Sequence, residues 1–205
     1  MTGPAKTQIR AYGIRVLLSR HAEIRKLKRE NTPGFHGNKF WTSSWLLMDY
    51  FKRRGLQKGA HVMELGCGWG LAGIYCAKKH DASVTGVDID PEVFPFLNLH
   101  ADINDVKIDT LKRSFSGLTA QHLKGIDVMI GADICFWEKQ VEQLKRLIVR
   151  ALRQGVGLVL ISDPGRPTFD EVGEYFKKKY DGEILDWTSR RPRTISGSIL
   201  KIAPR

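Results

Sequence analysis

Short apolar runs alternate with amphipathic stretches along most of this chain. The apolar runs predict strands at residues 62–65, 83–87, 106–111, 126–130, 157–162, 183–188 and 196–202. Apolar residues at helical spacing predict helices from residue 45 onward and at residues 71–79, 92–101, 138–153 and 168–180. This alternation predicts an α/β fold with a three-layer Rossmann-like sheet of about seven strands, mostly parallel. The closeness of the last two strands predicts a C-terminal hairpin with one antiparallel strand.

Polar residues indicate where two of the predicted helices begin. Ser43 or Ser44 precedes the helix near residue 45, where a hydroxyl can accept a hydrogen bond from the first helical turn. Thr168 and Glu171 have the spacing of a capping box and predict the start of the helix that runs to residue 180.

The first quarter of the chain carries nearly all of its net charge. The protein has 205 residues and a net charge of +11; residues 1–58 hold 13 Lys or Arg against 3 Asp or Glu, whereas residues 59–205 hold 20 against 19. Residues 9–29 predict a helix with Ile14, Leu17 and Ile24 on one side. We therefore expect a basic N-terminal helical extension over residues 1–34 and a single domain over residues 35–205. We interpret the extension as a lid or docking helix, with a solvated helix face and a mitochondrial presequence as alternatives.

A glycine-rich loop between a strand and a helix is the clearest chemical signal. The segment VMELGCGWG, from Val62 to Gly70, has glycine at every second position after its apolar run. Such a loop lets a ligand approach the backbone because no Cβ intervenes. Asp88 follows the next strand, about 20 residues beyond the glycines, where a carboxylate can bind ribose hydroxyls. The pattern predicts a nucleoside-containing cofactor; a turn without a ligand and a nicotinamide cofactor are the alternatives.

The cysteine content and the length of the apolar runs indicate the kind of compartment in which the protein works. Cys67, Cys76 and Cys135 lack CxxC spacing, which argues against a zinc site or a disulfide framework and for a reducing compartment. No apolar run is long enough to span a membrane. We expect a monomeric cytoplasmic protein with no metal site and no membrane span, and a mitochondrial location is the alternative.

The acidic residue before the glycines narrows the choice of cofactor. Glu64 stands two positions before Gly66, and this E-x-G-x-G-x-G pattern resembles the first motif of class I, seven-β-strand S-adenosylmethionine-dependent methyltransferases. The segments FWTSSWLLMDYF, ELGCGWG, VDID, GADICF and SDPGRP occur in the order seen in the small protein-lysine methyltransferases of that class. They look most like the branch that contains the electron-transfer-flavoprotein β-subunit lysine methyltransferase. The resemblance covers about residues 35–170, and the basic N-terminal segment has no counterpart in it.

The resemblance implies roles for particular residues in a methyltransferase domain over residues 35–205. The methionine end of S-adenosyl-L-methionine would be held by Glu64, Gly66, Cys67 and Gly68. Asp88 would bind the ribose, Ile89 would pack on the adenine, and Ala132 and Asp133 would contact the cofactor. Asp163 and Arg166 would shape the far wall. From their positions in the chain, Trp41 is expected to wall the pocket, unless it is a core residue, and Asp109 or Thr110 to lie near the adenine.

The segment after the fourth predicted strand suggests the methyl acceptor. Asp133 and Phe136 match the (D/E)xx(Y/F) motif of the lysine methyltransferases and are the expected catalytic residues. Asp133 would accept a hydrogen bond from the acceptor amine, and an apolar rim of Phe136 and Trp137 would favour the uncharged amine. The alternative role for Asp133 is to cap the helix that begins near residue 138.

We therefore expect methyl transfer to a lysine of a protein, with an acidic protein as a suitable partner for the basic chain and S-adenosyl-L-homocysteine as product. RNA or a small nitrogen-containing molecule is the alternative acceptor, and a cofactor-binding interaction protein without catalysis is the alternative outside enzymes. His36 has no catalytic partner in the sequence and is interpreted as a packed or solvated side chain.

Overall fold

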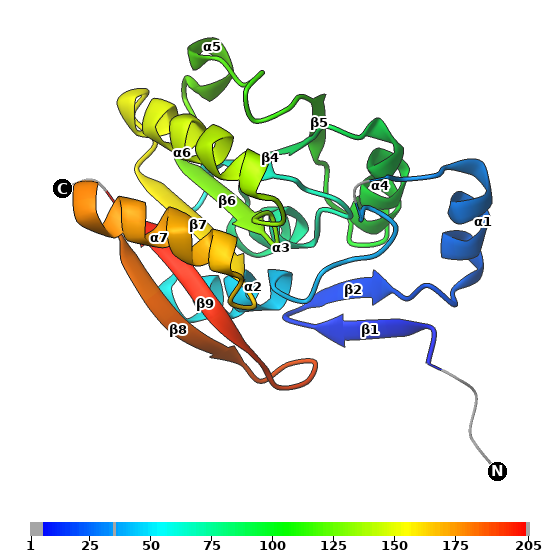
Figure 1. Cartoon of the computed structure of the whole chain (residues 1–205). Coiled ribbons are helices and arrows are strands. Elements are labelled where there is room, and N and C mark those ends of the chain that lie inside the picture. The colour runs from blue at the N-terminus through cyan, green and yellow to red at the C-terminus, as the bar shows by residue number, and fades with distance from the viewer. Residues whose placement is uncertain (1–5, 35, 204–205) are drawn as a thin grey trace.

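A seven-stranded mixed sheet forms the centre of the structure, a computed structural model that describes residues 6–34 and 36–203. Its strands, in spatial order, are β5 (Asp109–Lys112), β4 (Ser83–Asp88), β3 (His61–Leu65), β6 (Val128–Ala132), β7 (Leu158–Asp163), β9 (Ile195–Ile202) and β8 (Glu183–Ser189). From β5 to β7 neighbouring strands are parallel, whereas β9 is antiparallel to both β7 and β8 (Figure 1). The predicted Rossmann-like sheet with its C-terminal antiparallel hairpin is confirmed.

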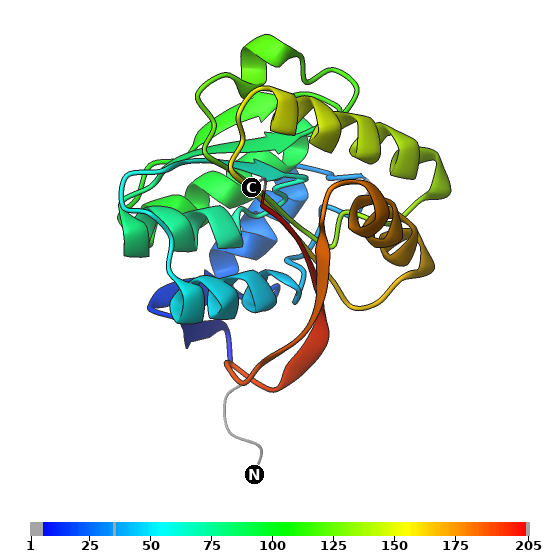
Figure 2. The same ribbon diagram turned by 90° about the vertical axis from the view of Figure 1, so that its left-hand side faces the viewer.

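Helices cover both faces of this sheet (Figure 2). One face carries α2 (Ser44–Arg54), α3 (Leu71–His80) and α4 (Phe94–Asp102), the last preceded by the short helix η1 (Pro91–Val93). The other face carries α5 (Ala120–Leu123), α6 (Glu138–Arg153) and α7 (Pro167–Lys179). Among the described helices, none is long and apolar enough to cross a membrane.

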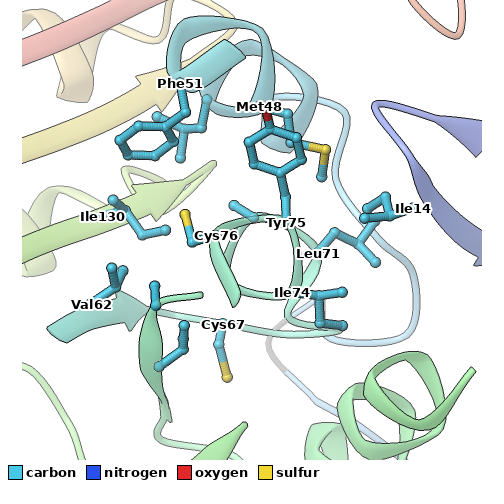
Figure 3. Close-up of a cluster of buried hydrophobic side chains, with 14 of the residues drawn as sticks. Ile14, Met48, Phe51, Val62, Cys67, Leu71, Ile74, Tyr75, Cys76 and Ile130 are labelled. Atoms are coloured by element: carbon cyan, nitrogen blue, oxygen red, sulfur yellow. The ribbon is translucent and has the colours of Figure 1, made fainter. Parts of the chain in front are cut away.

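Alternation along β3 divides the core between the two faces. Val62 belongs to the cluster under α2 and α3, whereas Met63 and Leu65 belong to the cluster under α6 and α7. Figure 3 shows the first cluster, in which Met48 and Phe51 of α2 lie on the side of α3 that carries Tyr75 and Cys76. Both faces of β3 are therefore buried, and packing on both faces holds its carboxyl end in position.

The predicted helix over residues 9–29 is wrong in its first half. The structure has a hairpin of β1 (Gln8–Ala11) and β2 (Ile14–Leu17), followed by the shorter helix α1 (Ala22–Glu30). Tyr12 and Gly13 both have positive φ, 54° and 78°, which is the geometry of a tight hairpin turn. Ala11, Ile14 and Val16 are buried in the core. Within β2, the buried Ile14 and Val16 are two positions apart, which is the period of a strand and not of a helix.

The N-terminal segment packs onto the same body as the rest of the chain. Ile14 reaches the α3 side of the core (Figure 3) and Ile24 of α1 is fully buried beside Phe96 of α4. The side chains of Asp90 and Glu92, near the end of β4, accept hydrogen bonds from the backbone that follows α1. The segment that follows α1 is thus held beside the end of β4.

Three other expected boundaries are corrected. The third predicted strand begins later, as the short edge strand β5, because residues 101–106 form a turn in which Asp105 has φ 57°. The capping box at Thr168 does not form, since α7 starts at Pro167 and the Thr168 hydroxyl donates to the carbonyl of Cys135. Ser43 occupies the N-cap of α2 without a side-chain cap.

Candidate active site

A cleft lies at the carboxyl ends of the parallel strands, where ligands bind in open α/β sheets. Sequence-predicted site residues that line it are Trp41, Gly66, Gly68, Asp88, Ile89, Ala132, Asp133 and Phe136. Trp137 of the expected apolar rim lines it as well. The fold therefore brings together residues from four separate stretches of sequence, as the predicted sheet requires.

The glycine loop forms the floor of the cleft. Gly68 has φ 49°, and a Cβ built there would meet nothing within 4 Å, so a ligand can lie directly on this peptide. Gly70 has a different role, because its Cβ would come within 2.6 Å of the Leu97 side chain. Glycine at position 68 therefore leaves the peptide open to a ligand, whereas glycine at position 70 lets the loop pack against α4.

Glu64 and Cys67, which were expected to hold the methionine end of the cofactor, lie beneath the glycine loop and do not line the cleft. Glu64 is buried, and its Oε2 accepts a hydrogen bond of 3.0 Å from the Gly73 amide at the start of α3. Burial raises the pKa of Glu64 to about 8. Cys67 is buried as well, with its Sγ towards Gly86 of β4, and burial raises the pKa of its thiol. Both side chains support the loop from the core side.

Asp88 and Ile89 form the wall at the end of β4. Asp88 accepts hydrogen bonds from the Gly68 amide at 3.1 Å and from the Asp90 amide at 3.0 Å. Burial raises the pKa of Asp88, and these amides oppose that shift. A carboxylate offers about four acceptor positions, so two amides leave capacity for ribose hydroxyls. Ile89 is 47% exposed and lines the cleft, which suits an aromatic base.

Asp109 is not positioned for the adenine contact expected of it. It begins β5 opposite Thr85, is exposed and is not among the residues that line the cleft. The end of β5 that faces the cleft is Lys112, opposite Asp88, and the next residues, Arg113 to Phe115, do line it. The late start of β5 explains this correction, since Asp109 lies at the amino end of the strand.

Asp133 is held by residues from two other elements. It is buried with φ 59°, and its Oδ2 accepts a hydrogen bond of 3.2 Å from the Ser43 amide at the start of α2. Its Oδ1 lies 2.9 Å from Nη1 of Arg166. The alternative role as a helix cap is wrong, because α6 begins at Glu138 after an N-cap residue, Trp137, with no side-chain cap.

Arg166 connects Asp133 to a second buried carboxylate. Its Nη1 lies 2.6 Å from Oδ2 of Asp163, which has no exposed surface, and the other oxygen of Asp163 accepts the amides of Gly165 and Arg166. Burial alone lowers the pKa of Arg166, but Asp163 and Asp133 raise it above its ordinary value. The guanidinium carbon also lies 4.1 Å from the centre of the Phe136 ring. Arg166 therefore orients both expected catalytic residues.

Aromatic residues form another part of the cleft wall. The ring centre of Phe136 lies 5.0 Å from that of Trp41 and 5.1 Å from that of His36. His36 also stacks on Trp137 at 5.8 Å and accepts a hydrogen bond from the Trp41 indole through its carbonyl. Lys39 lies 4.1 Å above the Trp41 ring. His36 is exposed to solvent, and its ring lies against the aromatic rings of the cleft wall.

Sequence reasoning missed several lining residues. His36 and Lys39 come from the segment before α2, and Arg113 to Phe115 follow β5. Gln140 and Gln143 line the cleft from the first turns of α6. None of these positions has a motif around it; the only available signal is that each follows or precedes an element whose end faces the cleft.

The cleft fits the predicted cofactor in shape and chemistry. An open backbone surface lies at Gly68, a carboxylate with spare acceptor capacity at Asp88 and an exposed apolar side chain at Ile89. These match a methionine moiety, a ribose and an adenine in the order in which S-adenosylmethionine presents them.

Comparisons with known proteins agree with this geometry. The sequence profile of the family described as lysine methyltransferase matches residues 23–180. The electron transfer flavoprotein beta subunit lysine methyltransferase of Xenopus laevis is 25% identical over 158 residues, which cover 75% of this chain and 63% of that relative. The chain therefore spans somewhat less than two thirds of the length of this curated relative.

Solved structures place the fold among methyltransferases. Precorrin-6y C5,15-methyltransferase of Geobacter metallireducens aligns with a TM-score of 0.62 and 11% identity, over 86% of this chain and 95% of its own. The Pyrococcus abyssi tRNA (uracil-54, C5)-methyltransferase in complex with S-adenosyl-L-homocysteine aligns with a TM-score of 0.61 and 20% identity, over 96% of this chain and 43% of its own. At these identities the likeness concerns the fold alone. Because the family profile covers more than half of its residues, the chain belongs to the lysine methyltransferase family.

Proposed function

We propose that the enzyme transfers a methyl group from S-adenosylmethionine to the side-chain amine of a lysine in a protein. The observation that carries this proposal is the pairing of Asp133 with an aromatic wall in the cofactor cleft. The wall consists of His36, Trp41, Phe136 and Trp137. The faces of these aromatic rings suit the aliphatic stem of a lysine, and the carboxylate of Asp133 would accept a hydrogen bond from its amine. The family match supports the same acceptor.

The chain's own residues position the reactants. When bound, S-adenosylmethionine supplies an electrophilic methyl group on a sulfonium, so that the reaction needs an aligned and uncharged amine. A free lysine has a pKa of about 10.4 and must first release a proton to solvent. The apolar rim disfavours the charged ammonium, and Asp133 orients the amine lone pair towards the methyl group. The products would be the methylated amine, which would release its extra proton to solvent, and S-adenosyl-L-homocysteine.

A labelled-transfer assay tests the acceptor class. Purified protein is incubated with S-adenosylmethionine carrying a tritiated methyl group and with a whole-cell extract, which is then treated with nuclease or with protease. We expect label that survives nuclease and is lost with protease, and amino-acid analysis of the labelled band is expected to yield methyl-lysine. A reaction with heat-denatured enzyme measures background.

Other outcomes identify the competing acceptors. Label that is lost with nuclease would make RNA the acceptor, and label only in the small-molecule fraction would indicate a small nitrogen compound. Cofactor binding with no label in any fraction would indicate a cofactor-binding interaction protein. Any of these results would contradict the proposal.

A further inference from the structure

A cluster of basic side chains lies outside the cleft, where the C-terminal hairpin meets α2. The basic ridge, as we call it, consists of Lys52 at the end of α2 and of Arg190, Arg191 and Arg193 in the turn between β8 and β9. All of these side chains are exposed. Figure 1 shows this turn beside the N-terminal hairpin and below α2. The ridge thus joins parts of the chain that are far apart in sequence.

A buried carboxylate holds these parts together. Asp49 of α2 accepts the hydroxyl of Tyr12 at 2.8 Å and the indole of Trp187 at 3.0 Å, and it pairs with Arg53 at 2.6 Å. The Tyr12 hydroxyl also lies 2.7 Å from that of Ser189, immediately before the basic turn. Because both hairpins and α2 meet at Asp49, the base of the ridge is fixed.

The positive charge of the ridge is not neutralised within the protein. Asp49 is buried and its ion pair is with Arg53. No ion pair joins Lys52, Arg190, Arg191 or Arg193 to a carboxylate among the described residues. Several exposed cations without counter-charges create a positive potential that attracts an anionic partner over about a Debye length.

The ridge is at the same edge of the sheet as the cleft. Ser198 of β9 pairs with Asp163 of β7, whose carboxylate binds Arg166 at the wall of the cleft. Arg193 precedes Ser198 by five positions in the chain, so their Cα atoms are at most roughly 18 Å apart. A polypeptide with a side chain in the cleft needs only a short further segment to reach the ridge.

We propose that the basic ridge docks an acidic segment of the protein that the enzyme methylates. This inference rests on the proposed lysine methylation and adds a specificity determinant to it. Arginine binds carboxylates through two parallel hydrogen bonds, which suits glutamate and aspartate side chains. The aromatic rings at the ridge do not offer free faces for nucleic-acid bases, since Arg53 lies 5.1 Å from the Trp187 ring and Lys52 lies 6.0 Å from the Tyr12 ring. An acidic polypeptide therefore fits better than a single-stranded RNA.

Binding of a defined acidic peptide tests the ridge directly. The probe is a fluorescein-labelled twelve-residue peptide of alternating Glu and Gly, titrated with the full chain saturated with S-adenosyl-L-homocysteine, and binding is followed by fluorescence anisotropy. The triple variant R190E/R191E/R193E is expected to bind about tenfold more weakly, at roughly twofold for each reversed side chain. Its affinity for S-adenosyl-L-homocysteine and its circular dichroism spectrum are expected to match those of the wild type.

A matched variant separates the ridge from net charge. K107E/K124E/R153E reverses three exposed cations before β5, before β6 and at the end of α6, which all lie at the opposite edge of the sheet. We expect it to bind the peptide within about twofold of the wild type. An equal loss in both triple variants, no peptide binding by the wild type, or tighter ridge-dependent binding of a labelled twelve-nucleotide oligoadenylate would overturn the proposal.

Transfer to the natural acceptor distinguishes this inference from the proposed function. With the protein band labelled by the wild type as substrate, the ridge variant is expected to raise KM several-fold and to leave kcat unchanged. Unchanged KM with methyl-lysine still formed would refute the ridge while the lysine methyltransferase function stands. Absence of protein label with the wild type would refute the function itself.

Discussion

At the residue scale, the cleft divides two tasks between two aspartates. Asp88 accepts a hydrogen bond from the glycine loop and is expected to bind the ribose, whereas Asp133 is held by Ser43 and Arg166 beside the aromatic wall. Both identities follow from sequence motifs, but the partners of Asp133 do not, because Ser43 lies 90 residues away. Substitutions of the two aspartates should therefore affect cofactor binding and methyl transfer separately.

Replacement of each aspartate is expected to affect a different step. Asp88→Ala removes acceptors for the ribose, and we expect it to weaken S-adenosyl-L-homocysteine binding by roughly 10- to 100-fold. Asp133→Asn keeps the shape of the side chain, and we expect unchanged cofactor affinity with kcat lowered about 100-fold. Isothermal titration calorimetry and a transfer assay measure the two quantities. Wild-type affinity in Asp88→Ala would refute the ribose assignment.

Removal of Arg166 is expected to separate positioning from stability. Arg166→Met leaves the buried Asp163 without its cation and is expected to cost roughly 3 kcal/mol of unfolding free energy. Adding Asp163→Asn removes the unpaired charge, so we expect the double variant to regain much of that stability in urea denaturation. Its kcat is expected to stay at least about tenfold low, because Asp133 and Phe136 still lack their common support. A double variant that regains wild-type kcat would show that Arg166 acts only on stability.

Glu64 is expected to make stability depend on pH. Its folded pKa of about 8 lies above the ordinary value of 4.5, so the folded state binds the extra proton in that interval. Stability is therefore lost as pH rises between these values, and Glu64→Gln lacks this loss. We expect the melting temperature of Glu64→Gln to rise relative to that of the wild type by about 3 °C or more between pH 6 and pH 8.5. A constant difference between the two proteins across this range would contradict the pKa shift.

At the element scale, the N-terminal hairpin differs most from expectation. The helical spacing of Ile14, Leu17 and Ile24 predicts one long helix. The structure instead has two strands, joined by a turn at Tyr12 and Gly13 with positive φ values, and Ala11 before the turn is buried. A two-stranded hairpin is marginal by itself and depends on what it packs against. Here it packs on α3 and is joined to the C-terminal hairpin through Tyr12.

Loss of the Tyr12 hydroxyl is expected to loosen that junction. Tyr12→Phe removes the hydrogen bonds to Asp49 and Ser189 and is expected to cost about 1–2 kcal/mol of unfolding free energy. Ser196→Ala, which removes an exposed contact with Thr188, serves as the control and is expected to change stability by less than about 0.5 kcal/mol. Urea denaturation compares them. Equal effects of the two substitutions would mean that the junction is not stabilising.

At the scale of the whole molecule, the segments form one body around the sheet. Side chains from β1, β2, α2, α3, β6 and β9 share one core cluster, so neither hairpin has a core of its own. The excess positive charge of residues 1–58 is carried by the N-terminal segments and α2, and the basic turn between β8 and β9 meets the end of α2. Basic residues from separate parts of the sequence therefore lie close together only in the folded protein.

A shared core predicts a single unfolding transition. Melting curves by tryptophan fluorescence and by far-ultraviolet circular dichroism are expected to coincide. S-adenosyl-L-homocysteine at 100 times its Kd is expected to add about 2.7 kcal/mol, which corresponds to roughly 5–10 °C for a chain of this size. An earlier transition in fluorescence alone would show that one hairpin unfolds independently.

The sequence by itself determined the sheet, the glycine loop and the acidic residues at the ends of β4 and β6. These features depend on local patterns: consecutive apolar residues for buried parallel strands, and glycines for a backbone that contacts a ligand. Only the tertiary structure decided that residues 8–17 form a hairpin, that Asp109 lies away from the cleft and that His36 belongs to its wall. It also decided that Ser43 and Arg166 hold Asp133, and that Asp49 fixes the base of the basic ridge. The physical reason is that these outcomes depend on partners distant in sequence, whose positions exist only once the sheet has brought the ends of its strands together.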